Sequence, residues 1–460
     1  MSLSGKEKNT NRTNEKEFRF IAVLLSAILM LACTACSSGE MVDNNSKDYD
    51  NTKASDTIKQ SDNVGDINKG SENTPETIHS NFLLTAKFEL EYDSVRPFNE
   101  GLAAVEKDDM WGFVDAKGNL VVPLEYYEVE DFSEGFAAVK GTDGKGDIGW
   151  GFIDKTGKVT VDFEYNSVNS FSEGLAAVKK FSKMGFVNTD GNIVIPCEYD
   201  LVHSFSEGLA AVGSQLNSSD FGKWGFIDKT GNTVIPMDYY HAESFKDGVA
   251  IVGTEYVDSR QSLQGFINKE GEIIIPLEYA SLKSDYNEGL AWAAKVIGNI
   301  KVDYNNLIID IVSGNVIKSG EGYYAGNKPF NDGCAAVRKE ALKSYWGFVD
   351  TNGDAITPFE YTTVRTFSEG LAAVCTGKDQ WGFIDTSGNV VLPLEYTNAE
   401  SFNEGLAAVY KNGKWGFIDT SINVVIPLEY DSAQSFSEGY AFVKKDGKWG
   451  ILQNIAYAGS

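Results

Sequence analysis

An internal repeat constrains the fold of this 460-residue chain more than any other feature of its sequence. A four-residue element close to Phe-Ser-Glu-Gly recurs at intervals of 34 to 44 residues. Its ten copies begin at Phe98, Phe132, Phe171, Phe205, Phe245, Tyr286, Phe330, Phe367, Phe402 and Phe436. Self-similarity at such a period predicts a repeat architecture, in which each unit buries its apolar faces against its neighbours.

The residues around each copy predict β-strands. In one clear unit, Gly405–Val409 reads Gly-Leu-Ala-Ala-Val, a short strand with small side chains toward both faces. Trp415–Asp419 alternates with a period of two, and Val424–Tyr430 is rich in β-branched residues. We expect the missing Cβ of Gly416 to let a side chain of a neighbouring unit approach. Pro427 cannot donate to a ladder, so the third segment is expected at a sheet edge or a bulge.

Each unit is therefore predicted to be a three-stranded antiparallel β-meander, and the chain to be all-β with no helix of substance. A Trp-Gly dipeptide marks the second strand of most units; it is degraded at Met184 and Gln264 and lost near Asn306. It stands at Trp111, Trp150, Trp224, Trp346, Trp381, Trp415 and Trp449. Together these motifs resemble the bacterial WG repeat family over about residues 82–452. The resemblance implies a repeat β-protein and transfers no catalytic residue.

The two ends of the repeat region leave the global arrangement open. Phe88–Tyr92 matches the third strand of a unit, whereas the last unit ends soon after Trp449 without that strand. The offset would let the N-terminal strand complete the last unit of a closed ring, as in propellers. Alternatively, each unit begins with that strand and the array stays open. Ten units exceed the four to eight blades of usual propellers, which favours an open superhelical array or an unusually large propeller-like ring.

One segment of the repeat varies in length throughout. Trp111 stands six positions after Val105, Trp150 eleven positions after Val139, and Trp224 twelve positions after Val212. The spacings elsewhere are nearly constant, so the variable segment is predicted to be a hairpin loop that tolerates insertion. If all units stack in one register, these hairpins emerge on one face.

The N-terminus reads as an export signal. Basic residues precede an apolar stretch, Phe20–Ala32, which is too short for a comfortable membrane span. The following residues resemble a lipoprotein signal box, which implies lipidation at Cys36, with Cys33 as the alternative. We expect a signal peptide over 1–36, a polar disordered tether over 37–80 and the repeat domain over 81–460. The protein would be exported and lipid-anchored on the outer face of the cytoplasmic membrane; an uncleaved anchor or plain secretion are the alternatives.

Charge and composition argue against several functions. The formal net charge of −26 repels nucleic acid and anionic headgroups. The chain has three histidines, no Cys or His cluster at metal-ligand spacing, and no nucleophile elbow, phosphate loop or dinucleotide fingerprint. Beyond the signal region, only Cys197, Cys334 and Cys375 remain, and they are expected to fill packing positions. We therefore expect no enzyme, no metal and no cofactor.

Two periodic features admit two interpretations each. The acidic residue before Gly in every unit is either a stripe of carboxylates that binds cations or a basic partner, or a turn residue that accepts backbone hydrogen bonds. The Trp residues either stack on sugar rings or fill the interface between units. A group required in all units is usually required for folding, so the structural interpretation is favoured for both.

The sixth unit, around 286–327, departs most from the pattern. It has Tyr286 in place of Phe, Ala-Trp-Ala-Ala in the first strand, no Trp-Gly, and a Tyr-, Asn- and Gly-rich stretch. Exposed aromatic side chains beside amides suit carbohydrate or protein recognition. The candidate binding residues are Trp292, Tyr304, Tyr323 and Tyr324. The alternative is a drifted repeat or a joint between sub-arrays.

These features predict a membrane-tethered, non-catalytic module that binds an extracytoplasmic protein or glycan, through the hairpin face and through the sixth unit. A structural spacer or assembly scaffold of the cell envelope is the alternative. A cryptic hydrolase built on a carboxylate pair is a third, weaker hypothesis.

Overall fold

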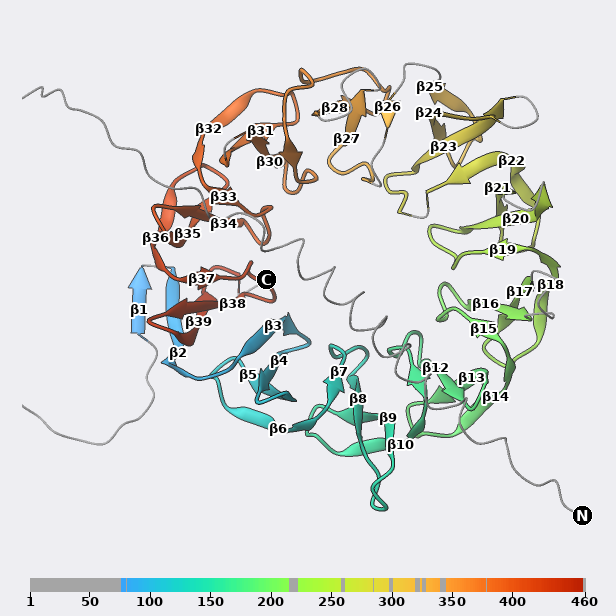
Figure 1. Cartoon of the computed structure of the whole chain (residues 1–460), viewed down its shortest axis with the longest axis horizontal. Coiled ribbons are helices and arrows are strands. Elements are labelled where there is room, and N and C mark those ends of the chain that lie inside the picture. Colours follow the sequence, from blue (N-terminus) through green and yellow to red (C-terminus); the bar gives the residue numbers. More distant parts are fainter. Residues whose placement is uncertain are drawn as a thin grey trace, which may run out of the picture. The chain divides into compact units, whose positions relative to one another are not determined.

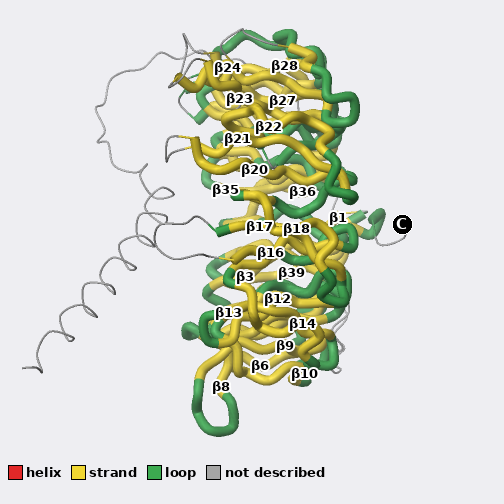
Figure 2. Tube along the Cα trace, turned by 90° about the vertical axis from the view of Figure 1, so that its right-hand side faces the viewer, coloured by secondary structure: helices red, strands yellow, loops and turns green. Residues whose placement is uncertain are grey.

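A computed structural model describes residues 76–457, apart from 80, 215–221, 258–260, 284, 298–300, 319–322, 325–327, 340–344 and 378. In this part of the chain the secondary structure is β, with turns and no helix (Figure 2). Accordingly, the described residues include no helix with the length and apolar character needed to cross a membrane. The predicted signal peptide, with Cys33 and Cys36, lies outside the described residues, as does the predicted tether up to residue 75.

The repeating unit is a four-stranded antiparallel sheet. In the third unit, β11 (Ser167–Val168), β12 (Leu175–Lys180), β13 (Lys183–Asn188) and β14 (Ile193–Tyr199) pair in chain order. The three longer strands are the predicted meander. The structure adds the two-residue strand β11, which precedes the Phe-Ser-Glu-Gly turn and pairs with β12.

The other units repeat this order, with local differences. The first strands are β3 (Ser94–Asn99), β7 (Glu128–Val129), β15 (Leu201–Val202), β19 (His241–Ala242), β26 (Tyr323–Tyr324), β29 (Thr363–Val364), β33 (Asn398–Ala399) and β37 (Ser432–Ala433). The second strands are β4 (Leu102–Lys107), β8 (Phe136–Thr142), β16 (Leu209–Ser214), β20 (Val249–Val257), β23 (Leu290–Ile297), β27 (Cys334–Lys339), β30 (Leu371–Thr376), β34 (Leu406–Lys411) and β38 (Tyr440–Lys445). The third strands are β5 (Met110–Asp115), β9 (Ile148–Asp154), β17 (Lys223–Asp228), β21 (Gln261–Asn268), β24 (Lys301–Asp310), β28 (Trp346–Asp350), β31 (Gln380–Asp385), β35 (Lys414–Asp419) and β39 (Lys448–Asn454). The fourth strands are β6 (Leu120–Tyr126), β10 (Val159–Tyr165), β18 (Thr233–Tyr239), β22 (Ile273–Leu282), β25 (Val316–Lys318), β32 (Val390–Tyr396) and β36 (Val424–Tyr430).

Aromatic pairs join successive units. Phe132 of the second unit packs edge-on against Phe113 of the first, with ring centroids 4.8 Å apart. The same contact recurs between Phe186 and Phe205 at 4.8 Å. The Ala-Ala pairs of the second strands are covered on both faces; Ala137 and Ala138 are fully buried. The core is therefore a succession of unit-to-unit interfaces, as a repeat protein requires.

The glycine of the Trp-Gly motif was predicted to face a side chain of a neighbouring unit, but it faces the backbone of its own unit. A Cβ on Gly112 would lie 2.4 Å from the backbone oxygen of Val122, in the fourth strand of the same unit. The register between β5 and β6 shifts here, because β6 bulges around Pro123. The proline thus stands at a bulge in an outer strand, as expected, and the glycine accommodates that bulge rather than a neighbouring unit.

The chain closes into a ring (Figure 1). The strand β2 (Phe82–Leu90) supplies the fourth strand of the last unit by pairing with β39, and β1 (Glu76–His79) pairs with its outer side. Trp449 donates its indole N–H to the backbone oxygen of Tyr92, at 3.1 Å. Ser437 donates its hydroxyl to the backbone oxygen of Phe98, at 2.7 Å. The structure selects the large propeller-like ring over the open array.

The fifth and sixth units are fused. Here β22 is ten residues long: its first part pairs with β21 of the fifth unit and its end pairs with β23 of the sixth. The result is a seven-stranded sheet, β19 to β25, where two four-stranded sheets would otherwise stand. The irregular stretch after Asp303 completes β24 and β25 and then supplies β26, the first strand of the seventh unit.

Candidate functional site

The predicted binding residues lie in different environments. Trp292 is 3% exposed and stacks on Phe330, with centroids 5.3 Å apart and an interplanar angle of 15°. It occupies the place that a buried alanine holds in the second strand of other units, so the expected exposed aromatic is absent at this position. Tyr304 lies in β24, and Tyr323 and Tyr324 form β26; the side chains of these three tyrosines lie outside the described residues.

The acidic residue before each Gly links one unit to the next. The carboxylate of Glu134 accepts hydrogen bonds from the backbone N–H groups of Glu173 (2.6 Å) and Gly174 (2.7 Å) in the following unit. The linkage crosses the closure as well, because Glu438 accepts the N–H groups of Glu100 and Gly101, both at 2.7 Å. Nine of the ten junctions carry such a bond. These carboxylates belong to turn residues that link each unit of the ring to the next.

Backbone conformation fits this role. Every one of these acidic residues has a positive φ, for example 54° at Glu134 and 51° at Asp332. A non-glycine residue is uncommon at such a φ, and at nine junctions the carboxylate bond to the next unit helps to hold it there. The predicted turn interpretation is therefore the one that the structure supports.

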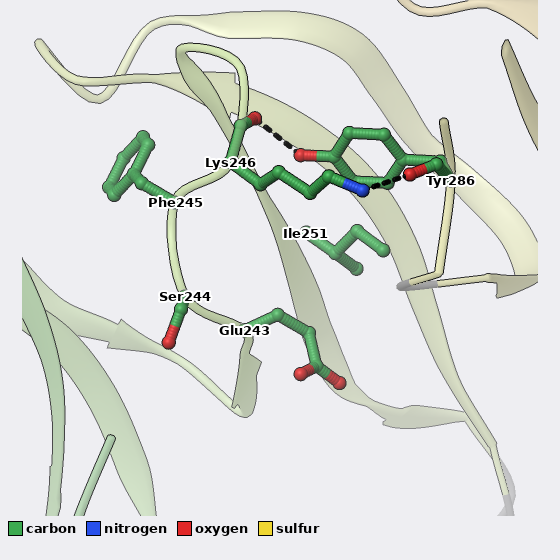
Figure 3. A pocket seen from close by; sticks show the side chains of 6 residues that line it. All are labelled: Glu243, Ser244, Phe245, Lys246, Ile251 and Tyr286. Carbon is green, nitrogen blue, oxygen red and sulfur yellow. Dashed lines mark hydrogen bonds between the residues drawn. The ribbon is translucent and has the colours of Figure 1, made fainter. Parts of the chain in front are cut away.

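The junction between the fifth and sixth units is built differently. Within the described residues, Asp247 makes no such bond to Gly289. Instead, Lys246, which replaces the usual Ser, donates its ammonium to the backbone oxygen of Tyr286. The Tyr286 hydroxyl donates in return to the backbone oxygen of Lys246 (Figure 3). At other junctions a Ser hydroxyl donates to the same backbone oxygen, as Ser172 does to Phe205, so Lys246 takes over the serine bond and Tyr286 adds a second one.

A pocket of about 180 Å³ opens beside this lysine–tyrosine pair. Its lining comes from the β19–β20 connection, from β20 and from the segment before β23. The lining residues are Glu243, Ser244, Phe245, Lys246, Ile251 and Tyr286 (Figure 3). In that view the side chains of Glu243, Lys246, Ile251 and Tyr286 lie on one side, whereas the Ser244 hydroxyl points away from them.

The electrostatics of the pocket suit non-covalent binding. His241 lies 3.1 Å from the Glu243 carboxylate, and this hydrogen bond, with the charges of His241 and His203, holds the pKa of Glu243 below its usual value. Burial, with the charges of Asp247 and Glu207, raises the pKa of Tyr286. At neutral pH the pocket therefore presents a carboxylate and a neutral phenol, and an acid–base pair poised near neutrality is not formed by these two groups.

The Trp residues of the Trp-Gly motif are largely packed into the ring. Trp346, Trp381 and Trp449 are at most 9% exposed, and Trp111 and Trp415 pack against core clusters while keeping partial exposure. Cations stack on several of them: Arg96 lies 4.6 Å from the ring centroid of Trp111. These contacts favour the packing interpretation over stacking on sugars.

The variable hairpins join the second and third strands of each unit. The Phe-x-Glu-Gly turns of successive units bond to one another, so the opposite ends of the second strands, where the hairpins begin, lie together on the other face. The best-described long hairpin joins β8 to β9 and projects from the ring (Figure 1). Its Asp143 accepts the N–H groups of Lys145 and Asp147, which makes it a self-contained turn.

Sequence reasoning did not identify the pocket. Two substitutions in the repeat signalled it: Lys246 in place of Ser and Tyr286 in place of Phe, facing each other across one junction. In the described residues, no group of three or more His, Cys, Asp or Glu is arranged to hold a metal ion.

The chain was compared with known proteins. A family model described as WG containing repeat matches residues 87–111, 111–145, 150–182, 184–213, 224–255, 265–295, 346–378, 381–415 and 415–449. These matches skip 296–345, the irregular stretch. No curated protein matches the chain.

Solved structures resemble it distantly. A eukaryotic initiation factor is 10% identical with a TM-score of 0.39, over 79% of this chain and 92% of that one. BamB from Moraxella catarrhalis is 10% identical with a TM-score of 0.31, over 79% and 97%. The WD40 β-propeller domain of Doa1 is 12% identical with a TM-score of 0.23, over 81% and 97%.

Proposed function

Since the chain belongs to the WG containing repeat family, we propose that it is a non-catalytic binding module for an extracytoplasmic protein or glycan. The single observation that carries this proposal is the concentration of length variation in the hairpins on one face, while nine of the ten junctions keep the same carboxylate bond. A rigid scaffold with one variable face is the usual arrangement of a recognition surface.

The regular features of the ring are already engaged in folding. The periodic carboxylates accept backbone N–H groups, and the periodic tryptophans are packed. Because these periodic groups are engaged in folding, we propose binding in preference to a hydrolase. Ring closure leaves no free terminal unit for end-to-end extension, so we also prefer binding to a spacer.

The location of the module is part of the proposal. The apolar stretch Phe20–Ala32 and the following Cys36, with Cys33 as the alternative, support export and lipid anchoring to the outer face of the cytoplasmic membrane. The anchor would hold the ring at the cell envelope, where its ligand would be met.

The test compares the full chain with a variant whose long hairpins are all shortened to the six-residue spacing of Val105 to Trp111. A matched control carries equal numbers of Gly and Ser substitutions in the Asp-x-x-Gly turns between third and fourth strands. Each is used to capture partners from envelope extracts. A partner held by the full chain and the control, and lost from the shortened but folded variant, is the expected result. Retention by the shortened variant would reject the proposal.

A further inference from the structure

One position of the repeat, two residues before the Phe of each Phe-x-Glu-Gly turn, carries charge across the junctions. In the first unit it is Arg96, which donates to the backbone oxygen of Val129 at 3.0 Å and lies 3.6 Å from the Asp131 carboxylate in the second unit. In the eighth unit it is Arg365, which donates to the backbone oxygen of Ala399 at 2.7 Å and pairs with Glu400 at 2.7 Å. A cation in one unit thus reaches an acid in the next.

These cations also share a position relative to tryptophan. Arg96 lies 4.6 Å from the centroid of Trp111, and Arg365 lies 5.5 Å from that of Trp381, each in its own unit. The recurrence shows that the fold places this side chain in the same way around the ring.

The seventh unit has a cation at this position, but the eighth unit has no acid at the place of Glu400. Lys328 precedes Phe330 by two residues and lies 5.8 Å from the centroid of Trp346, as the pattern requires. The equivalent residue in the next unit is Arg365, a second cation. Arg338 lies over the same Trp346 ring, at 4.2 Å. Two cations, Lys328 and Arg365, therefore lie at this junction, whereas the first–second and eighth–ninth junctions pair a cation with a carboxylate.

No carboxylate of the described residues lies within ion-pair distance of Lys328. Burial, with the charge of Arg365 next to it, lowers the pKa of the Lys328 ammonium. Arg365 is paired with Glu400 but keeps further donors: its Nε and one terminal nitrogen are engaged, and a guanidinium has five N–H donors. Its side chain is 33% exposed, so the group remains reachable from solvent.

We propose that the junction between the seventh and eighth units binds an oxyanion, a carboxylate or phosphate group, between Lys328 and Arg365. The group would occupy the place that Asp131 or Glu400 takes at equivalent junctions. It would accept charge-assisted hydrogen bonds from the ammonium and from the free donors of the guanidinium. Both residues lie in the connections between the first and second strands of their units and not in a hairpin, so the site is independent of the proposed hairpin face.

Calorimetric titration of the full chain with inorganic phosphate, and separately with acetate, tests the proposal. We expect saturable heat with at least one of the two probes, and the stronger probe identifies whether the site prefers phosphate or carboxylate. Lys328→Gln should lower the affinity about tenfold, because one charge-assisted contact is lost. Lys445→Gln, which removes a lysine paired with Glu429 at 3.0 Å, is the matched control and should leave the affinity unchanged.

A second variant keeps the test valid if Lys328→Gln folds poorly. Lys328→Glu would recreate the cation–acid pair of the other junctions, so it should abolish anion binding while raising the melting temperature. No saturable heat in the wild type with either probe would overturn the proposal. So would equal affinities in the wild type, Lys328→Gln and Lys328→Glu.

Discussion

The first to fourth units and the fifth to seventh units solve the same packing problem in different ways. In the regular arc, each junction is closed by a carboxylate that accepts backbone N–H groups of the next unit, and each sheet has four strands. In the irregular arc, a lysine and a tyrosine close one junction, two sheets merge through β22, and the cation at Lys328 meets another cation.

The difference shows where the ring can vary without losing closure. The junction without the carboxylate bond remains linked, because Lys246 and Tyr286 exchange hydrogen bonds with each other's backbone. A pocket opens at that junction, and two junctions later Lys328 has no carboxylate partner among the described residues. The pocket and the lysine without a carboxylate partner both lie where the sequence departs from the repeat.

Removal of β2 should have the largest effect, because it breaks the closure on which both arcs depend. Deletion of residues 76–92 exposes the partners of Phe82 and Leu84, which are buried against the last unit. We expect a loss of roughly 5 kcal/mol or more in the free energy of unfolding. Denaturant titration of the full chain and the deletion measures it. A loss under about 1 kcal/mol would show that the units hold together without closure.

Alanine at the Trp-Gly glycine should distinguish the two arcs. A Cβ on Gly112 would meet the backbone oxygen of Val122 at 2.4 Å, whereas a Cβ on Gly347 would meet the Phe359 side chain at 2.9 Å. A side chain can move and a paired strand cannot, so Gly112→Ala should cost about 3 kcal/mol and Gly347→Ala about 1 kcal/mol. Equal losses in the free energy of unfolding would mean that the seventh unit is as tightly constrained as the first.

Loss of the carboxylate should matter less at the junction between the fifth and sixth units than in the regular arc. Glu134→Ala removes the acceptor of two N–H groups and should cost about 1 kcal/mol, while Asp247→Ala should stay within about 0.5 kcal/mol. Thermal unfolding of both variants gives the comparison. Glu134→Gln, which keeps one acceptor oxygen, should fall between Glu134→Ala and the wild type. A loss at Asp247 as large as that at Glu134 would contradict the assigned difference between the junctions.

The smallest predicted effect is on the pH dependence of the melting temperature in acid. Hydrogen bonds from Thr230 and Asn232 lower the pKa of Asp228 from 3.8 to about 2, whereas the equivalent residue of the fifth unit is the non-titrating Asn268. A lowered pKa gives stability that is present above the unfolded value and lost as pH falls through the folded value. The difference in melting temperature between wild type and Asp228→Asn should therefore shrink between pH 4 and pH 2. Asn268→Asp offers the converse control, and a constant difference would show that Asp228 is not ionised in the fold.

Much of the fold could be predicted from residue pattern. The second, third and fourth strands, the Gly turns and the bulge at Pro123 follow from period, turn chemistry and the missing proline N–H. The first strands, such as Ser167–Val168, are too short to produce a periodic signal. Closure depends on the rotation between successive units, which side-chain packing sets, so the match of Phe88–Tyr92 to the outer strand indicated the ring without deciding it.

The site was less predictable for the same reason. Trp292 suggested an exposed aromatic because its neighbours in sequence are irregular, yet its place in the second strand is a buried one. Alignment of the units on their strands, instead of on composition, would have assigned it to the core. The pocket at Lys246 and Tyr286 needed the spatial neighbour, because those residues are 40 positions apart and belong to different units.

The central claim is that a uniform ring presents its variable hairpins to a ligand. Hydrogen exchange of the full chain, alone and with the captured partner, tests it most directly. The account predicts that binding slows exchange in the β8–β9 hairpin and its equivalents and leaves the Asp-x-x-Gly turns unchanged. Protection confined to those turns, with unaltered hairpins, would contradict it.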